Sequence, residues 1–134
     1  MIYSIDAELT APVYDTEVTD RVSDAMENIF PTASPEYRHG ELTATVHDFE
    51  HFSELLHRQA ILDTARGIFF DTKQGDSFSF RIKKQAAFEG VVNFNVDEPG
   101  ELGDIAVYVT VNEPSVEEFI DQIAPRTEDG KPVE

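Results

Sequence analysis

Five cations gathered in one stretch are the side chains of this sequence best suited to bind a ligand. The 134 residues include 27 Asp and Glu against 10 Lys and Arg, for a formal net charge of -17. Residues 66–84 hold five of the cations and two acids, so five minus two leaves this stretch at +3. The five are Arg66, Lys73, Arg81, Lys83 and Lys84. They could neutralise the phosphates of a polyanion or pair with acidic side chains across a sheet, and the sequence leaves both open.

Alternation within this stretch predicts a strand with two different faces. Phe78, Phe80 and Ile82 alternate with polar residues, so we expect them to face a core. Arg81 and Lys83 then point outward. Proteins that bind RNA on a sheet stack bases on exposed aromatic side chains or contact phosphates with cations, and core phenylalanines favour the second mode. The predicted RNA-contacting residues, with cations for phosphates and hydroxyl or amide groups for sugars and bases, are Lys73, Ser77, Ser79, Arg81, Lys83, Lys84 and Gln85.

Motifs for catalysis and for metal binding are weak. His47 and His51 have the spacing that places two side chains on one helix face, but Asp48 stands where the metalloprotease motif requires Glu. The chain has no cysteine and no Gly-x-Ser-x-Gly sequence for a nucleophile. We therefore expect no enzyme activity, no metal and no cofactor.

Composition favours a folded protein without a membrane segment. Hydrophobic residues make up 40% of the chain and include ten phenylalanines, which is too much apolar material for a disordered chain. The sequence contains no apolar run of 18 residues, and its first 30 residues do not resemble a signal peptide, so we expect a cytoplasmic protein. Its acidic residues are spread throughout, which is typical of proteins from salt-adapted, halophilic organisms.

Hydrophobic periodicity predicts the element order β-α-β-α(α)-β-β-β-α. Strands are expected at residues 3–10, 42–46, 78–82, 92–96 and 105–111. Helices are expected at 18–29 with a cap at Asp15 or Thr16, at 49–65 with a break near 58–60, at 85–88, and at 116–123 after a capping box that begins at Ser115.

This order predicts an α+β fold, with helices packed on one face of a largely antiparallel sheet. The other sheet face is left to water or to a partner. Residues 1–124 are expected to form a single domain. Residues 125–134 are polar without periodicity, so a flexible tail is expected there.

One stretch resembles a known family. Lys84-Gln85-Ala86-Ala87-Phe88-Glu89-Gly90, followed by Asn93-Phe94, is similar to the most characteristic sequence of a family of small archaeal proteins. Two flanking stretches agree, Leu102-Gly103-Asp104-Ile105 and Ala124-Pro125-Arg126-Thr127-Glu128-Asp129-Gly130. The resemblance covers nearly the whole chain and implies an archaeal source, RNA as the partner, no catalytic residues, and a fold like the large-subunit ribosomal protein that binds 5S rRNA.

The same motif has a structural interpretation. Small residues and a glycine permit a tight crossing between strands, so residues 86–90 could serve the fold rather than a ligand. We therefore expect an RNA-binding protein that uses its uncovered sheet face and a small basic island. The alternative is a non-catalytic interaction or scaffold protein that forms a homodimer through the sheet.

Overall fold

Alternating apolar and polar residues produce a five-stranded sheet in the computed structural model, which describes residues 3–98, 103–128 and 131–132. The strands are β1 (Ser4–Pro12), β2 (Glu36–Arg38), β3 (Glu41–Val46), β4 (Ser77–Lys83) and β5 (Asp104–Glu113). They lie in the order β2-β3-β1-β5-β4, and every neighbouring pair is antiparallel. The predicted α+β fold with a largely antiparallel sheet is confirmed.

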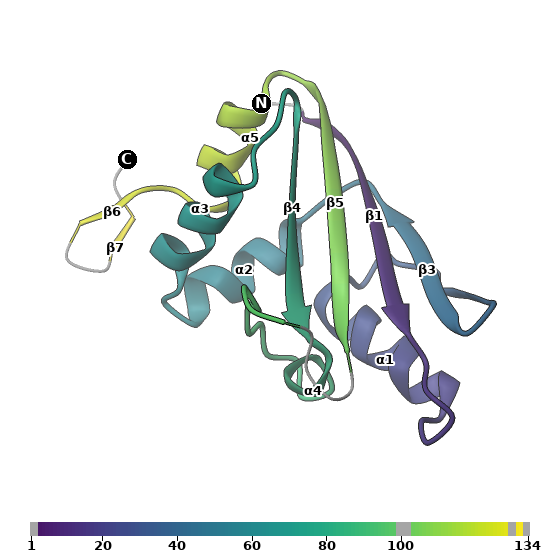
Figure 1. Ribbon diagram of the computed structural model, residues 1–134. Helices are drawn as coiled ribbons and strands as arrows, with labels where there is room; N and C mark the ends of the chain where they lie inside the picture. The colour runs from purple at the N-terminus through teal and green to yellow at the C-terminus, as the bar shows by residue number, and fades with distance from the viewer. Residues whose placement is uncertain (1–2, 99–102, 129–130, 133–134) are drawn as a thin grey trace.

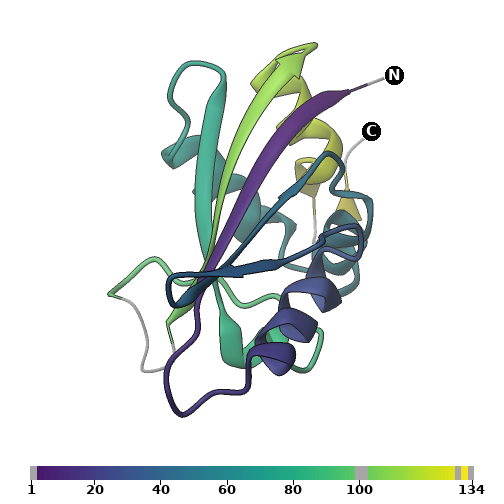
Figure 2. The same ribbon diagram turned by 90° about the vertical axis from the view of Figure 1, so that its right-hand side faces the viewer.

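Helices cover one face of this sheet and leave the other bare (Figures 1 and 2). The helices are α1 (Thr19–Ile29), α2 (Glu50–Arg58), α3 (Leu62–Asp71), α4 (Lys84–Ala87) and α5 (Val116–Ile123). Along the central strand β1, Ile5, Ala7 and Leu9 are buried under the helices, while Asp6 and Glu8 are exposed on the opposite side. We call the uncovered side the open face. No described helix has the length and apolar character needed to cross a bilayer.

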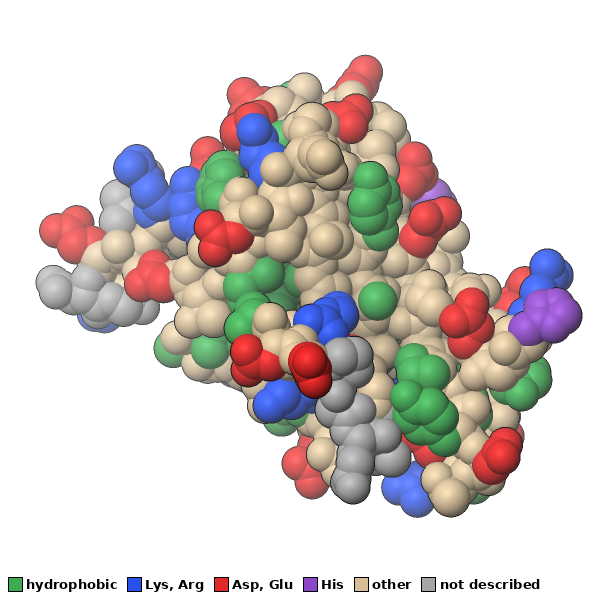
Figure 3. All heavy atoms as spheres, in the orientation of Figure 1, with side chains coloured by type: hydrophobic (Ala, Val, Ile, Leu, Met, Phe, Trp, Pro, Cys, Tyr) green, Lys and Arg blue, Asp and Glu red, His purple; other side chains and the backbone are tan. Residues whose placement is uncertain are grey.

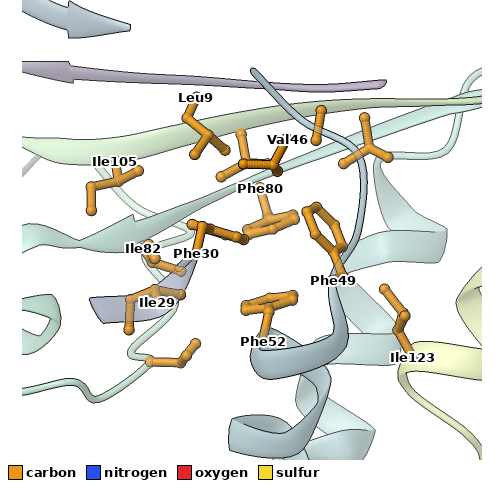
Figure 4. Close-up of a cluster of buried hydrophobic side chains, with 14 of the residues drawn as sticks. Leu9, Ile29, Phe30, Val46, Phe49, Phe52, Phe80, Ile82, Ile105 and Ile123 are labelled. Carbon is orange, nitrogen blue, oxygen red and sulfur yellow. The ribbon is translucent and has the colours of Figure 1, made fainter. Parts of the chain in front are cut away.

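A cluster of phenylalanines joins the helices to the covered face (Figure 4). The Phe52 ring on α2 stacks on the Phe80 ring of β4, with ring centroids 5.1 Å apart. The Phe49 and Phe30 rings lie 5.2 Å and 5.3 Å from the Phe52 ring. All four side chains are buried. Since burial of a large apolar side chain contributes about 1.5–3 kcal/mol, this cluster fixes α2 against β4.

The expected strand at residues 92–96 is wrong, although this segment does lie beside β4. Only a single bridge forms there, between Ile82 and Phe94. The Gln59 side chain binds the Val92 backbone instead, with Nε2 donating to the carbonyl at 2.8 Å and Oε1 accepting from the N–H at 2.9 Å. The Gln59 side chain, from the corner between α2 and α3, therefore makes the two backbone hydrogen bonds that a neighbouring strand would make to Val92.

Side-chain and loop groups also occupy the outer edge of β4. The Thr72 hydroxyl donates to the Ser79 carbonyl at 2.7 Å and accepts from the Ser79 N–H at 3.2 Å. Farther along, the Lys83 N–H donates to the backbone carbonyl of Asn93 at 2.8 Å, and the Asn95 N–H donates to the Arg81 carbonyl at 2.9 Å. This edge strand is thus bound along most of its length.

Two local expectations near the N-terminal half need correction. The strand β2 was not expected, and a two-residue turn joins it to β3 with both His39 and Gly40 at positive φ, as a type I′ hairpin requires. The α1 helix begins at Thr19 after Val18, without a side-chain cap from Asp15 or Thr16.

Two other local predictions are confirmed. The helical region breaks between Arg58 and Leu62, where Ala60 has a φ of 57°. The hydroxyl of Ser115 caps α5 by accepting from the Glu118 N–H at 3.1 Å.

The C-terminal segment contains a short hairpin. Its strands are β6 (Thr127–Glu128) and β7 (Lys131–Pro132), and the Thr127 hydroxyl donates to Asp63 on α3 at 2.5 Å. The expected division into a domain at 1–124 and a flexible tail at 125–134 stays a prediction. Leu102, Asp129 and Gly130 of the family-like stretches lie outside the described residues.

We expect Phe52→Ala to lower the free energy of unfolding by about 3–5 kcal/mol, because the ring is central to the cluster. Tyr37→Ala is the control, since that ring is 56% exposed on β2, and its effect is expected to stay within about 0.5 kcal/mol. Urea denaturation followed by circular dichroism measures both. Equal losses in the two variants would contradict this account of the core.

Candidate nucleic-acid interface

The outward residues of β4 lie on the open face, where the alternation placed them. Phe78, Phe80 and Ile82 are buried against the helices. Ser79 and Arg81 are partly exposed on the other side, and Lys83 is exposed at the end of the strand. Strand β4 therefore offers one hydroxyl and two cations to a ligand on this face.

An acidic residue of the neighbouring strand neutralises Arg81. Its Nη1 lies 3.3 Å from Oδ2 of Asp104, and its Nη2 donates to the backbone carbonyl of Asp97. Asp104 is itself buried and accepts from the Asn95 amide at 3.0 Å. The Arg81 guanidinium thus has a carboxylate and a backbone carbonyl as partners within the protein. These two contacts orient it in the absence of a ligand.

The predicted basic island is divided between the two layers of the fold. Lys73 and Arg66 reach the helix α5, where they pair with Glu117 at 2.9 Å and Asp121 at 2.6 Å. The hydrogen bond from Lys73 holds the pKa of the Glu117 carboxyl below its ordinary value. Of the five clustered cations, only Arg81 and Lys83 are on the open face.

Lys84 is not a surface residue, and its assignment as a phosphate contact is corrected here. Its side chain is fully buried, and Nζ donates to the Pro12 carbonyl at 2.5 Å and to Glu17 Oε1 at 2.9 Å. The same ammonium lies 5.1 Å from the centroid of the Tyr14 ring. Lys84 continues the inward series of Phe78, Phe80 and Ile82, and the chain turns into α4 at this residue.

The Glu17 carboxylate is buried together with its partner. Only 8% of its side chain is exposed, and Oε1 also accepts from the backbone N–H of Tyr14 at 3.0 Å. The ion pair therefore holds the loop between β1 and α1 against the end of β4. It is a structural contact between segments 67 residues apart.

Ser77 is likewise corrected as an RNA contact. This residue is buried, and its hydroxyl donates to the Gln74 carbonyl at 2.9 Å while it accepts from the Tyr108 hydroxyl at 3.0 Å. Gln85 is exposed on α4, just beyond the end of β4. Ser77 is thus occupied by contacts within the protein, and Gln85 lies beyond the strand that carries Ser79.

Positive side chains of the described residues do not merge into a patch on the open face. Figure 3 views this face, and its blue groups are separated from one another by red carboxylates and by neutral side chains. Green side chains form separate small groups across the same view. The arrangement differs from the continuous basic surface typical of proteins that bind nucleic acids through phosphates.

A groove of about 610 Å³ runs along the open face beside β4 and β5. Its lining combines apolar, hydroxyl and charged groups, among them Glu8, Thr10, Ser79, Arg81, Val96, Ala106 and Tyr108. We call this the open-face groove. Its volume is large enough for a nucleotide, and ligand sites of small molecules commonly begin near 300 Å³.

Tyr108 forms a fixed aromatic surface in the open-face groove. It lies in the middle of β5, directly opposite Ser79 on β4 and Glu8 on β1. Its ring is held by its hydroxyl bond to Ser77, yet the residue is 52% exposed. An exposed ring that is already immobilised can stack with a planar ligand at little further entropic cost.

His47 and His51 each lie beside one carboxylate. Nδ1 of His47 lies 3.1 Å from Asp6 Oδ1, and His51 lies 3.8 Å from Glu54. Within the described parts of the chain, no group of three His, Cys, Asp or Glu side chains could hold a metal ion.

Residues 6–112, which include most of every strand of the sheet and all residues that line the open-face groove, match a family model described as RNA binding. The chain belongs to this RNA-binding family. The predicted membership of an archaeal family with RNA binding is confirmed at that level, and the relatives compared below are archaeal.

Relatives of known sequence and structure extend the likeness over nearly the whole chain. A UPF0201 protein of Thermococcus kodakarensis is 38% identical over 136 residues, covering 96% of each protein. A UPF0200/UPF0201 protein of Archaeoglobus fulgidus is 36% identical over 131 residues, and the match covers 40% of that longer protein. The crystal structure of a UPF0201 protein from Methanococcus jannaschii superposes with a TM-score of 0.90 at 32% identity, covering 96% of this chain and 99% of that one.

In this RNA-binding family member, sequence reasoning missed Tyr108. The signal was present, because Val107 and Val109 are on the buried face and an aromatic residue between them must point outward. The contacts predicted from sequence are cations and polar groups, whereas the largest exposed side chain in the groove is aromatic. Glu8 was not predicted either. The chain has 27 acidic residues, and the sequence does not show which of them lies beside an exposed aromatic ring.

We expect Lys84→Met to lower the free energy of unfolding by about 3–5 kcal/mol, because Glu17 would be left buried without its cation. The adjacent variant Lys83→Met removes an exposed ammonium and is expected to change stability by at most about 0.5 kcal/mol. Adding Glu17→Gln to Lys84→Met should recover part of the loss. Urea unfolding measures all three, and similar losses in the two lysine variants would contradict the buried ion pair.

We expect Lys73→Ala to raise the pKa of Glu117 toward its ordinary value. Because the pKa is lowered in the folded protein, the pair stabilises the fold above the pKa of the unfolded chain and is lost as pH falls through the lowered value. Carboxyl NMR titration measures the midpoint, with Lys83→Ala as the control. An unchanged midpoint in Lys73→Ala would show that the hydrogen bond does not persist in solution.

Proposed function

We propose that this protein binds unpaired RNA in the open-face groove, with a base stacked on Tyr108. The observation that carries the proposal is an exposed but immobilised aromatic ring in the middle of an uncovered sheet, in a chain that belongs to an RNA-binding family. Single-stranded RNA is commonly bound in this way, because every base has a face that can stack. No catalytic step is part of the proposal.

The charge distribution favours stacking over phosphate contacts. The chain carries a net charge of -17, and Arg81 is already paired with Asp104. Lys83 is exposed at the end of β4 and forms no ion pair among the described residues. One phosphate beside Lys83 is therefore consistent with the groove, but a long series of phosphate contacts is not.

The groups around Tyr108 supply polar contacts for a base or a sugar. Ser79 and Thr10 line the same groove from the strands on either side of β5. Their hydroxyls can donate or accept, so they suit base edges and ribose hydroxyls alike. Of the residues predicted from sequence, Ser79 and Arg81 line the groove, and Lys83 lies at the end of β4 outside this lining.

Several finer predictions also remain proposals. A fold like the large-subunit ribosomal protein that binds 5S rRNA would offer an RNA class to test first. A cytoplasmic location and a halophilic source would place the binding at high salt, where stacking and hydrogen bonds retain more of their strength than phosphate contacts.

We expect Tyr108→Ala to weaken binding to a short unstructured RNA by about 5- to 150-fold, which corresponds to about 1–3 kcal/mol for one stacked base. Tyr108→Phe keeps the ring and loses only the bond to Ser77, so a smaller loss is expected. Fluorescence anisotropy with a labelled eight-nucleotide RNA containing all four bases measures the affinity.

Tyr37→Ala is the matched control, because this second exposed tyrosine lies on β2 and outside the open-face groove. Equal affinity of wild type and Tyr108→Ala would refute the proposed site. A change of oligomeric mass in Tyr108→Ala, measured by light scattering without an effect on RNA, would favour the scaffold alternative.

A further inference from the structure

A carboxylate lies beside the aromatic surface of the open-face groove. Glu8 on β1 is the direct cross-strand partner of Tyr108 on β5. Glu8 is exposed, and within the described residues it takes part in no ion pair. A second carboxylate, that of Asp71, lines the groove at its other side, next to β4.

These carboxylates determine which part of a nucleotide fits next to Tyr108. An ionised carboxylate only accepts hydrogen bonds, and it repels a phosphate at short range. A base stacked on the Tyr108 ring therefore meets Glu8 best with an edge that carries N–H donors. The phosphates of the same nucleotide are directed away from Glu8, toward solvent or toward Lys83.

The four bases differ in the donors that they offer to one carboxylate. Guanine has N1–H and the N2 amino group side by side, so it can donate two parallel hydrogen bonds to the two oxygens. Uracil has one N–H between two carbonyl groups. Adenine and cytosine have one amino group next to an acceptor nitrogen, which faces the second carboxylate oxygen unfavourably.

We propose that the open-face groove selects an unpaired guanine, which stacks on Tyr108 while Glu8 accepts from its N1–H and N2 amino groups. This inference rests on the proposed function and adds the base class and the residue that reads it. Thr10, two residues along the same face of β1, lines the groove with a hydroxyl that can donate to a guanine acceptor.

The test compares four octamer RNAs that consist of uridines with a single G, A, C or U at one central position. In wild type we expect the G-containing octamer to bind about tenfold more tightly than the all-uridine octamer, as for one bidentate contact to a base. In Glu8→Gln we expect this preference to fall below about twofold, since an amide has only one acceptor oxygen. Binding of the all-uridine octamer should be unchanged or slightly tighter, because a negative charge is removed.

Glu41→Gln is the matched control. It makes the same charge change on β3, and Glu41 is exposed outside the open-face groove. This variant should keep the guanine preference, and thermal unfolding of both variants verifies that they are folded.

The outcomes separate this inference from the proposed function. Equal affinity of wild type for the four octamers, with all of them weakened in Tyr108→Ala, would overturn guanine selection and leave RNA binding in place. A preference that persists in Glu8→Gln would overturn the role of Glu8. No measurable binding to any octamer would refute both proposals. Spermine, a polycation, tests whether the groove binds cations instead of RNA. If spermine binds more tightly than RNA and loses its affinity in Glu8→Gln, both proposals are refuted as well.

Discussion

One-sided burial of the antiparallel sheet is the constraint on which the rest of this structure depends. The buried apolar residues of β1, β4 and β5 face the helices, where the Phe52 ring of α2 stacks on the Phe80 ring. Because strand side chains alternate, every residue between them must face the other way. The open-face groove and its polar lining are therefore direct products of the same pattern that builds the core.

The acidic residues of this chain act locally as well as through the net charge. Carboxylates pair with four of the five cations that cluster in sequence, and each pair joins segments that are distant along the chain. Lys84 is the most buried of these cations, and its bond to Glu17 holds a loop in place, so this ammonium is not accessible to a ligand. Recognition by this protein is thus expected to depend on planar stacking and on hydrogen-bond geometry.

Periodicity predicted most of the elements, because alternation and helical spacing depend only on near neighbours. It could not place Lys84 or Val92, since each is held by a side chain from a remote part of the chain, Glu17 and Gln59 respectively. The candidate site was predicted in part. Arg81 and Lys83 were predicted from their charge. Tyr108 and Glu8 could not be predicted in this way, because only the strand register places them next to each other.

The occupied edge of β4 hinders a second copy of the protein from extending the sheet. A second chain that tried to extend the sheet there would find the Ser79 and Lys83 N–H groups and the Ser79 and Arg81 carbonyls already bonded. At the opposite margin, β2 provides only three residues, two of them charged. Neither margin is a good template for adding further strands, so the open face can stay uncovered without an adjacent edge that promotes fibre growth.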